Sequence, residues 1–298
     1  MAIRILIFGR NGQVARELAR IPWPRSVETI LAGRAECDLA QVGAAERMIG
    51  ATEPTIIINA AAYTAVDLAE KESEAARRLN ADAPAEIARA AAKSGAKLIH
   101  LSTDYVFDGG GSAAWRETDP CRPLSVYGST KLSGEEAIRA ALIEHVILRT
   151  SWVFSPHGAN FVKTMLRLGR TRDDVAIVGD QIGGPTAAAD IAQAAARIAA
   201  DIVHGKKAYG TYHFAGAPDT SWHRFAQAIF DRAAKDGLRV PSAIREITTA
   251  EYPTPACRPL NSRLDCAAIA RDWGIARPYW EKALDRCIEV LAKEPAPS

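Results

Sequence analysis

Short apolar runs alternate with alanine-rich segments of helical period over the first half of the chain. The runs have the length and composition of buried strands, and they are IRILIF (3–8), VETILA (27–32), TIIINAAA (55–62), AKLIHLS (96–102) and HVILRT (145–150). The intervening segments repeat apolar residues at helical spacing. This order of elements predicts an α/β fold built on a doubly wound parallel sheet, with helices on both faces.

The pattern becomes less regular after Ser151, where Pro- and Gly-rich loops separate short elements. The helical run Asp190–Val203 resembles the helices of the first half again. We therefore expect a larger domain over residues 1–150, to which 177–207 returns, and a smaller, partly discontinuous C-terminal domain over 151–298.

Composition narrows the classes of partner. The 298 residues carry a formal net charge of only +2, with acidic and basic residues interspersed, which disfavours a nucleic-acid partner. No apolar run is long enough to predict a membrane span, and the five scattered cysteines lack metal-ligand spacing. Free thiols are typical of a reducing compartment, so we expect a cytoplasmic protein. We also expect it to act as a monomer or homodimer.

A glycine loop follows the first predicted strand directly. In GRNGQVA, Gly9 and Gly12 occupy the tight turn and Ala15 the position where the next helix packs on the sheet. Residues this small let backbone N–H groups and the helix N-terminus approach a pyrophosphate. The alternative is an ordinary glycine turn without a ligand. The context predicts a Rossmann-type dinucleotide-binding domain over 1–150.

The end of the second predicted strand bears on the choice of nicotinamide cofactor. An acid commonly bonds the adenine ribose there, but this chain has Gly33 and Arg34. A guanidinium suits a 2′-phosphate, and Arg10 could add a second positive charge, so we expect NADPH to be preferred over NADH. Asp38 and Leu39 could line the adenine end. Alternatively, Arg34 is an ordinary solvated side chain.

A tyrosine and a lysine lie four positions apart in VYGSTK. If this segment opens a helix, Tyr127 and Lys131 share one face, and the ammonium would lower the pKa of the phenol. The fourth predicted strand ends in Ser102, Thr103 and Asp104, at the sheet edge where parallel sheets bind ligands. Such pairs also occur by chance on surface helices, but this context favours proton transfer.

The chain resembles the extended short-chain dehydrogenases/reductases, and within them the dTDP-4-dehydrorhamnose reductase family. The resemblance runs almost end to end and is carried by FGRNGQVA, NAAAYTAVDLAE, STDYVFDG, VYGSTKLSGE, RTSWVF, DQIGGPT and YPTPACRPLNSRLD. The chain departs from the family pattern at Ala15, which replaces the usual third glycine, and at Gly33-Arg34, which replace an acid.

The resemblance implies roles for particular residues. The implied catalytic residues are Thr103, Tyr127 and Lys131. The implied cofactor-binding residues are Gly9, Gly12, Gln13, Val14, Ala61, Ala62, Tyr63, Thr64, Tyr127 and Lys131. Thr103, Asp104 and Trp152 match substrate-binding positions, and Arg258 could pair with a diphosphate. Trp152 could instead be a core residue.

The resemblance further implies NADPH-dependent reduction of the C4 keto group of dTDP-4-dehydro-L-rhamnose, with the smaller domain binding this sugar nucleotide. Alternatives are another keto-sugar-nucleotide reductase or epimerase of the superfamily, or a non-catalytic NADP-binding regulatory subunit. A dehydratase is disfavoured because Asp104 and Tyr105, rather than an Asp-Glu pair, follow Thr103. Some family members are metal-bridged dimers, but only Glu17 fits such a site, and we expect no metal.

Overall fold

Six parallel strands form the main sheet of the computed structural model, which describes residues 3–293. In spatial order they are β10 (Gly210–His213), β5 (His145–Thr150), β4 (Lys97–Thr103), β3 (Ile56–Asn59), β1 (Ile3–Phe8) and β2 (Val27–Ala32). The five strands predicted from the first half are present, and β10 is added at one edge. The order reverses between β1 and β3, so the loops that follow these two strands diverge and leave a crevice.

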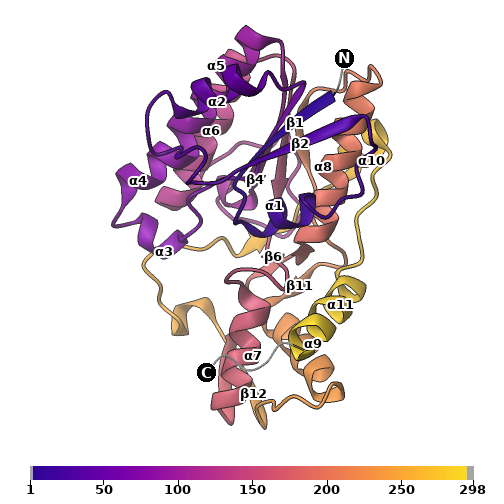
Figure 1. Cartoon of the computed structure of the whole chain (residues 1–298). Helices are drawn as coiled ribbons and strands as arrows, with labels where there is room; N and C mark the ends of the chain where they lie inside the picture. The colour runs from indigo at the N-terminus through magenta and orange to yellow at the C-terminus, as the bar shows by residue number, and fades with distance from the viewer. Residues whose placement is uncertain (1–2, 294–298) are drawn as a thin grey trace.

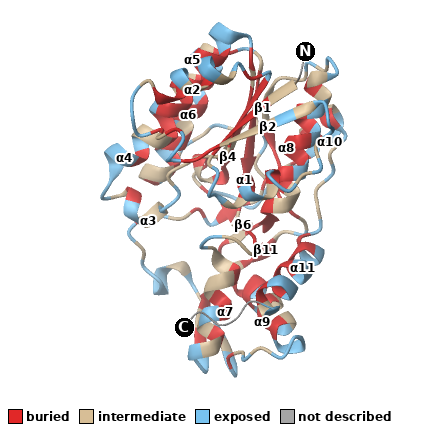
Figure 2. Cartoon of the chain, viewed as in Figure 1, coloured by how far each residue is buried: buried red, intermediate tan, exposed pale blue. Residues whose placement is uncertain are grey.

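Helices cover both faces of this sheet (Figure 1), which confirms the predicted doubly wound α/β fold. One face carries α1 (Gln13–Leu18), α8 (Ala188–Val203) and α10 (Ala267–Trp273), and the other carries α2 (Ala44–Thr52), α5 (Ala83–Ser94) and α6 (Val126–Ala141). The alternation of strand side chains supplies both layers: Ile5 and Ile7 belong to the first apolar core, and Leu6 and Phe8 to the second. Figure 2 shows the buried residues concentrated along these layers.

The first turn of helix α6 packs closely against the segment that follows β4. Ser125 caps it by accepting a hydrogen bond from the Gly128 backbone N–H at 3.2 Å. A Cβ atom on Gly128 would lie 2.2 Å from the Tyr105 carbonyl oxygen, so only glycine allows this approach. Around it lie the short elements η2 (Asp104–Val106), α3 (Val66–Ala69), α4 (Ser73–Arg77) and the π-helix η1 (Arg78–Asp82).

A smaller domain lies below the main sheet in Figure 1. Its apolar core joins α7 (Phe161–Thr171), α9 (Trp222–Lys235) and α11 (Trp280–Lys293) to the parallel pair β7 (Asp174–Val178) and β12 (Ala243–Ile247). Its remaining short elements are β6 (Val153–Phe154), β8 (Ile182–Gly183), β9 (Thr186–Ala187), β11 (Thr220–Ser221), η3 (Thr249–Glu251) and β13 (Asn261–Ser262). The segment 177–207 divides between the two cores: Ile177 packs in the smaller one, whereas α8 packs against the main sheet.

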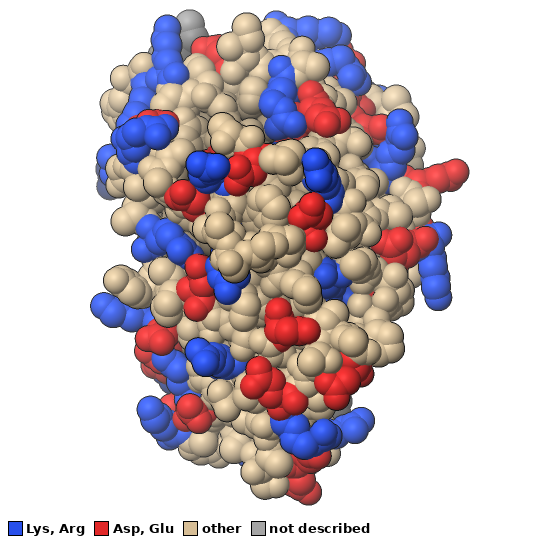
Figure 3. Space-filling model, turned by 180° about the vertical axis from the view of Figure 1, so that it is seen from behind, with Lys and Arg blue, Asp and Glu red and all other residues tan. Residues whose placement is uncertain are grey.

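The surface alternates in charge. On the face seen in Figure 3, Lys and Arg side chains are interspersed with Asp and Glu. Exposed ion pairs of the smaller domain include Arg239–Asp173 and Arg245–Asp174. None of the helices within residues 3–293 combines the length and the apolar character needed to cross a bilayer.

Candidate active site

A cavity of about 650 Å³ opens at the carboxyl ends of β1, β3 and β4, where the strand order reverses. Every residue predicted to bind the cofactor lines it except Tyr63. The lining residues from that set are Gly9, Gly12, Gln13, Val14, Arg34, Asp38, Leu39, Ala61, Ala62, Thr64, Tyr127 and Lys131. The Tyr63 backbone N–H instead donates to Asn80, and its phenol donates to Glu72. A single cavity therefore collects residues that are distributed over more than 120 positions of the sequence.

The glycine loop forms one end of the cavity. Gly9 has φ of +96°, and a Cβ atom there would lie 2.8 Å from the Ala60 carbonyl oxygen, so glycine is required. Gly12 precedes α1 and donates its N–H to the Gly9 carbonyl oxygen at 2.7 Å. Ala15 is fully buried on the face of α1 that packs against the sheet, as its place in the motif predicts. A bare backbone turn facing a cavity fits the pyrophosphate of a dinucleotide.

The adenine end of the cavity contains both signs of charge. Glu36 accepts a hydrogen bond from the Gly33 N–H at 2.8 Å and pairs with Arg10. Arg10 is therefore partly neutralised, which weakens the expected second positive charge. Within residues 3–293, Arg34 makes no ion pair or hydrogen bond, so its guanidinium stays available to a ligand phosphate.

Tyr127 sits in the cavity wall beside the end of β4. Its removal from bulk water raises the pKa of the phenol to about 12, and the adjacent Thr103 hydroxyl opposes part of that change. Thr103 in turn donates to Asp104 Oδ1 at 3.1 Å. The structure thus brings Tyr127, Thr103 and Asp104 close together. A neutral phenol at physiological pH is a proton donor rather than a base.

Lys131 lies one turn after Tyr127 but does not contact the phenol. Its Nζ donates to the Leu101 carbonyl oxygen at 2.7 Å and lies 3.2 Å from His100 Nε2. Burial lowers the pKa of Lys131 to about 8, and the negative charge of Glu135 acts in the opposite direction. The expected lowering of the Tyr127 pKa by Lys131 is therefore not seen, because the ammonium is held against β4 instead.

Sequence reasoning missed a buried network of charges directly behind the cavity. Glu135 accepts from Ser102 at 2.6 Å and receives two hydrogen bonds from Arg149, at 2.9 and 2.6 Å. Glu135 and Arg149 are 0% and 2% exposed. A buried pair of this kind is tolerated only when both partners are hydrogen-bonded, and here it fixes α6 to the ends of β4 and β5. The available signal in the sequence was Arg149, a charged residue inside the apolar run HVILRT.

The smaller domain reaches the cavity through a loop that sequence reasoning also missed. Gly158 and Ala159 line the cavity, and Gln13 Oε1 accepts from Ser155 Oγ at 2.7 Å and from Asn160 Nδ2 at 3.0 Å. Asn160 also caps α7 by accepting from the Lys163 N–H. The loop is thus tied both to the glycine-loop helix and to its own domain.

None of the predicted substrate residues Thr103, Asp104, Trp152 and Arg258 lines the 650 Å³ cavity, although Thr103 and Trp152 directly adjoin the lining residues Ser102 and Val153. Asp104 is buried, its Oδ2 has no hydrogen-bond partner within the described residues, and burial raises its pKa to about 6. Trp152 adopts φ of +48° and stacks on Trp222 with ring centroids 3.6 Å apart. Arg258 makes a forked ion pair with Asp67 and so is not a free cation.

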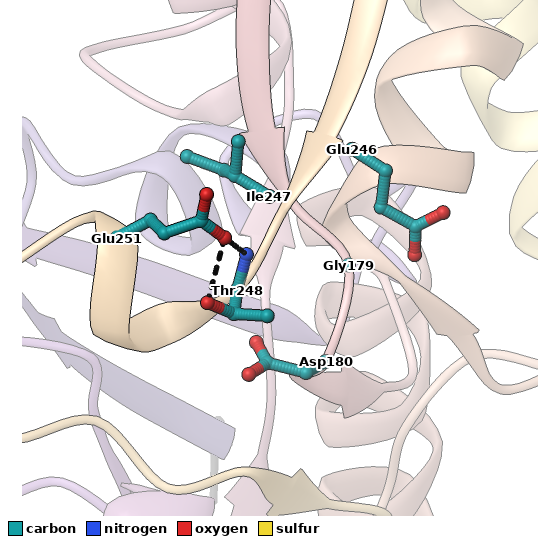
Figure 4. A pocket seen from close by; sticks show the side chains of 6 residues that line it. All are labelled: Gly179, Asp180, Glu246, Ile247, Thr248 and Glu251. Atoms are coloured by element: carbon teal, nitrogen blue, oxygen red, sulfur yellow. Dashed lines mark hydrogen bonds between the residues drawn. The ribbon is translucent and has the colours of Figure 1, made fainter.

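A second hollow, lined by Gly179, Asp180, Glu246, Ile247, Thr248 and Glu251, lies in the smaller domain (Figure 4). Glu251 accepts from the backbone and side chain of Thr248, and Asp180 accepts from Thr249. These acids therefore serve as caps of the local turn. Over residues 3–293 no cluster of three or more His, Cys, Asp or Glu side chains is suited to hold a metal ion.

Comparisons with known proteins identify the family of this chain. The family model described as RmlD substrate binding domain matches residues 3–293. A dTDP-4-dehydrorhamnose reductase of Aggregatibacter actinomycetemcomitans is 44% identical over 284 residues, which cover 94% of this chain and 97% of that protein. A protein of the same name from Sinorhizobium fredii is 43% identical over 297 residues, covering 98% of this chain and 99% of that protein.

A solved structure of dTDP-4-dehydrorhamnose reductase from Bacillus anthracis, in complex with NADP, superimposes with a TM-score of 0.88 at 33% identity. The match covers 97% of this chain and 100% of that chain. The resemblance inferred from the sequence motifs is thereby confirmed. The chain belongs to the RmlD substrate binding domain family, and the two relatives compared above are named dTDP-4-dehydrorhamnose reductases.

Proposed function

We propose that this protein reduces the C4 keto group of dTDP-4-dehydro-L-rhamnose with NADPH and releases dTDP-L-rhamnose, the last step of dTDP-rhamnose biosynthesis. The observation that carries the proposal is the full-length similarity to dTDP-4-dehydrorhamnose reductases combined with one cavity that Tyr127, Lys131 and the glycine loop share. The protein is an oxidoreductase whose partner is a small sugar nucleotide. We expect it to act in the cytoplasm as a monomer or homodimer.

The cavity fits NADPH. The Gly9–Gly12 turn would take the pyrophosphate, and Arg34, Asp38 and Leu39 would surround the adenine ribose and its 2′-phosphate. Ala61, Ala62, Tyr63 and Thr64 follow β3 and would contact the cofactor farther along the crevice. When bound there, NADPH supplies the hydride that reduces the carbonyl carbon.

Side chains of the protein would supply the proton that the carbonyl oxygen gains. Tyr127 would donate its phenolic proton to the carbonyl oxygen. The Thr103 hydroxyl, which donates to Asp104 in this structure, would turn to donate to the same oxygen as negative charge develops. Lys131, when protonated, stabilises the phenolate that remains and would hold the nicotinamide ribose through its other hydrogens.

The remaining polar groups would bind the sugar nucleotide. Asp104 Oδ2, buried and without a partner in the described residues, can accept from a sugar hydroxyl. Trp152 would offer an aromatic face to the deoxysugar, and Arg258 would share its charge between Asp67 and a diphosphate.

The test is an assay of purified protein with enzymatically prepared dTDP-4-dehydro-L-rhamnose and NADPH, with NADH in parallel. Loss of NADPH absorbance with formation of dTDP-L-rhamnose is the expected result. Turnover without net NADPH consumption, by protein purified with bound NAD, would identify an epimerase instead. Tight NADPH binding without turnover of any keto-sugar nucleotide would identify a regulatory subunit.

A further inference from the structure

A chain of hydrogen bonds runs through the sheet to Lys131. The Ala61 backbone N–H donates to Asn59 Oδ1 at 3.1 Å, Asn59 Nδ2 lies 3.1 Å from His100 Nδ1, and His100 Nε2 lies 3.2 Å from Lys131 Nζ. Asn59 ends β3, His100 lies inside β4, and Lys131 belongs to α6. The exposed fractions of Asn59, His100 and Lys131 are 1%, 0% and 2%, so water does not compete for these bonds.

The backbone fixes the direction of this chain. The Ala61 N–H can only donate, so the Asn59 oxygen must face it and the Asn59 amide nitrogen must face His100. His100 Nδ1 therefore accepts. A neutral imidazole with an accepting Nδ1 carries its proton on Nε2, and burial holds the pKa of His100 well below its ordinary value, so the ring is neutral.

The proton on His100 Nε2 points at Lys131. An ammonium there would set two donors against each other, whereas an uncharged amine can accept through its lone pair. Both forms of Lys131 can still donate to the Leu101 carbonyl oxygen. The geometry thus favours the uncharged amine, and burial acts in the same direction.

The other ionisable groups near this chain do not remove the preference. Glu135, one turn beyond Lys131 on α6, favours the ammonium, but Arg149 and Arg139 are paired with that carboxylate. His145 on β5 affects His100 only through its charge, and burial lowers the pKa of His145. Tyr127, on the preceding turn of α6, keeps its proton because its pKa is raised.

We propose that Asn59 and His100 are a positioning pair that fixes the Nε2–H tautomer of the imidazole and thereby favours the uncharged form of Lys131. The pair keeps the lysine able to gain and lose a proton near neutral pH. Since Ala61 lines the cavity, the pair also connects the β3 loop to the lysine. Its consequence for kcat rests on the proposed reductase function, whereas its consequence for the protonation of Lys131 does not.

The first experiment measures the tautomer in the wild-type protein. Selective ¹⁵N labelling of histidine distinguishes Nδ1 and Nε2 by long-range ¹H–¹⁵N correlation, and the signals of His100 are identified by their loss in His100→Gln. We expect a neutral ring protonated on Nε2 from pH 5 to pH 9. A ring protonated on Nδ1, or a charged ring within that interval, would overturn the inference without reference to any substrate.

The second experiment uses Asn59→Asp to reverse the direction of the hydrogen bond between residue 59 and His100. The carboxylate still accepts from Ala61, but its other oxygen now accepts from His100 Nδ1–H, which turns Nε2 into an acceptor for an ammonium. In protein with ¹³C-labelled lysine, the titration of Lys131, assigned with Lys131→Arg, should move up by about one pH unit, a roughly tenfold change in its protonation equilibrium. The alkaline limb of the kcat profile should move with it.

The matched control is Asn80→Asp. Asn80 is also fully buried and contacts Thr130 on α6 at 3.2 Å, but it does not bond His100. This variant should leave the His100 tautomer unchanged, which separates the hydrogen-bond chain from an added charge.

If Asn59→Asp does not fold, His100→Gln should give the same upward movement of the Lys131 titration, because its amide oxygen can accept from the ammonium. An unmoved Lys131 titration in folded Asn59→Asp or folded His100→Gln contradicts the proposal. A moved titration in a protein without reductase activity upholds it and rejects the proposed function.

Discussion

Arg258 forms an ion pair with Asp67, which lies 191 positions earlier in the sequence. One guanidinium nitrogen donates to the carboxylate at 3.1 Å and the other at 2.8 Å. Asp67 belongs to α3 of the larger domain, and Arg258 belongs to the loop between η3 and β13. The hydrogen bonds from Arg258 lower the pKa of Asp67. The pair therefore ties the loop of the smaller domain to the larger one beside the candidate substrate residues.

The pair gives a first prediction about the diphosphate. Arg258→Ala should raise KM for the sugar nucleotide by about tenfold or more with a smaller change in kcat, because the proposed charged hydrogen bond to the diphosphate is removed. Asp67→Asn, which keeps the cation, should change KM by less than about threefold, since a partly exposed ion pair contributes little. Steady-state kinetics check both variants. If Asp67→Asn raised KM as much as Arg258→Ala, the pair itself, and not the cation, would be what matters.

Removal of the Tyr127 hydroxyl should separate chemistry from binding. Tyr127→Phe is expected to lower kcat by at least about 100-fold because the proton donor is absent. NADPH affinity, measured by fluorescence quenching, should change by less than about threefold, since the ring still lines the cavity. Tyr209→Phe is the control, because Tyr209 bonds Glu144 at the opposite edge of the sheet. Turnover retained in Tyr127→Phe would remove the phenol from its proposed role.

Cofactor choice depends on two arginines with different partners. Arg34→Ala should lower the ratio of kcat/KM for NADPH over NADH by about tenfold, because the substitution removes the guanidinium proposed to bind the 2′-phosphate and disturbs no ion pair within residues 3–293. Glu36→Gln should raise the same ratio, since it releases Arg10 from its ion pair. Steady-state kinetics with the two cofactors measure both ratios. An unchanged ratio in Arg34→Ala would show that its guanidinium is simply solvated.

Asp104 predicts a pH dependence of stability. Burial raises its pKa from 3.8 to about 6, so the folded state holds this proton more tightly than the unfolded state does. The contribution of this group to the free energy of unfolding is fully present below pH 3.8, and it is lost as the pH rises through about 6. Asp104→Asn should therefore be more stable than wild type at pH 7.5, by about 1 to 3 kcal/mol, and this gain should vanish near pH 3.5.

Urea unfolding of Asp104→Asn and wild type at the two pH values measures this difference. The same variant should bind the sugar nucleotide less tightly, because an amide replaces one acceptor of the site. A stability difference that stayed constant with pH would mean that the pKa of Asp104 is the same in the folded and unfolded states.

Local patterns were sufficient to predict the sheet, the glycine loop and the turn that carries Tyr127 and Lys131. Strand period, helix period and a strand–turn–helix motif can each be recognised within about a dozen residues, without knowledge of the rest of the chain. The residues predicted for the cofactor from those motifs line one cavity because parallel strands bring their carboxyl ends to one edge.

The hydrogen-bond partners of those residues, in contrast, follow from the packing of the whole molecule. Lys131 is directed to Leu101 and His100 instead of to Tyr127, because α6 packs closely on β4. The Glu135–Arg149 pair depends on the order of strands in the sheet. The ion pair of Arg258 with Asp67 joins two domains. Such pairings link residues far apart in sequence, and the free energy that selects them comes from burial and polar satisfaction across the whole fold, which no local period encodes.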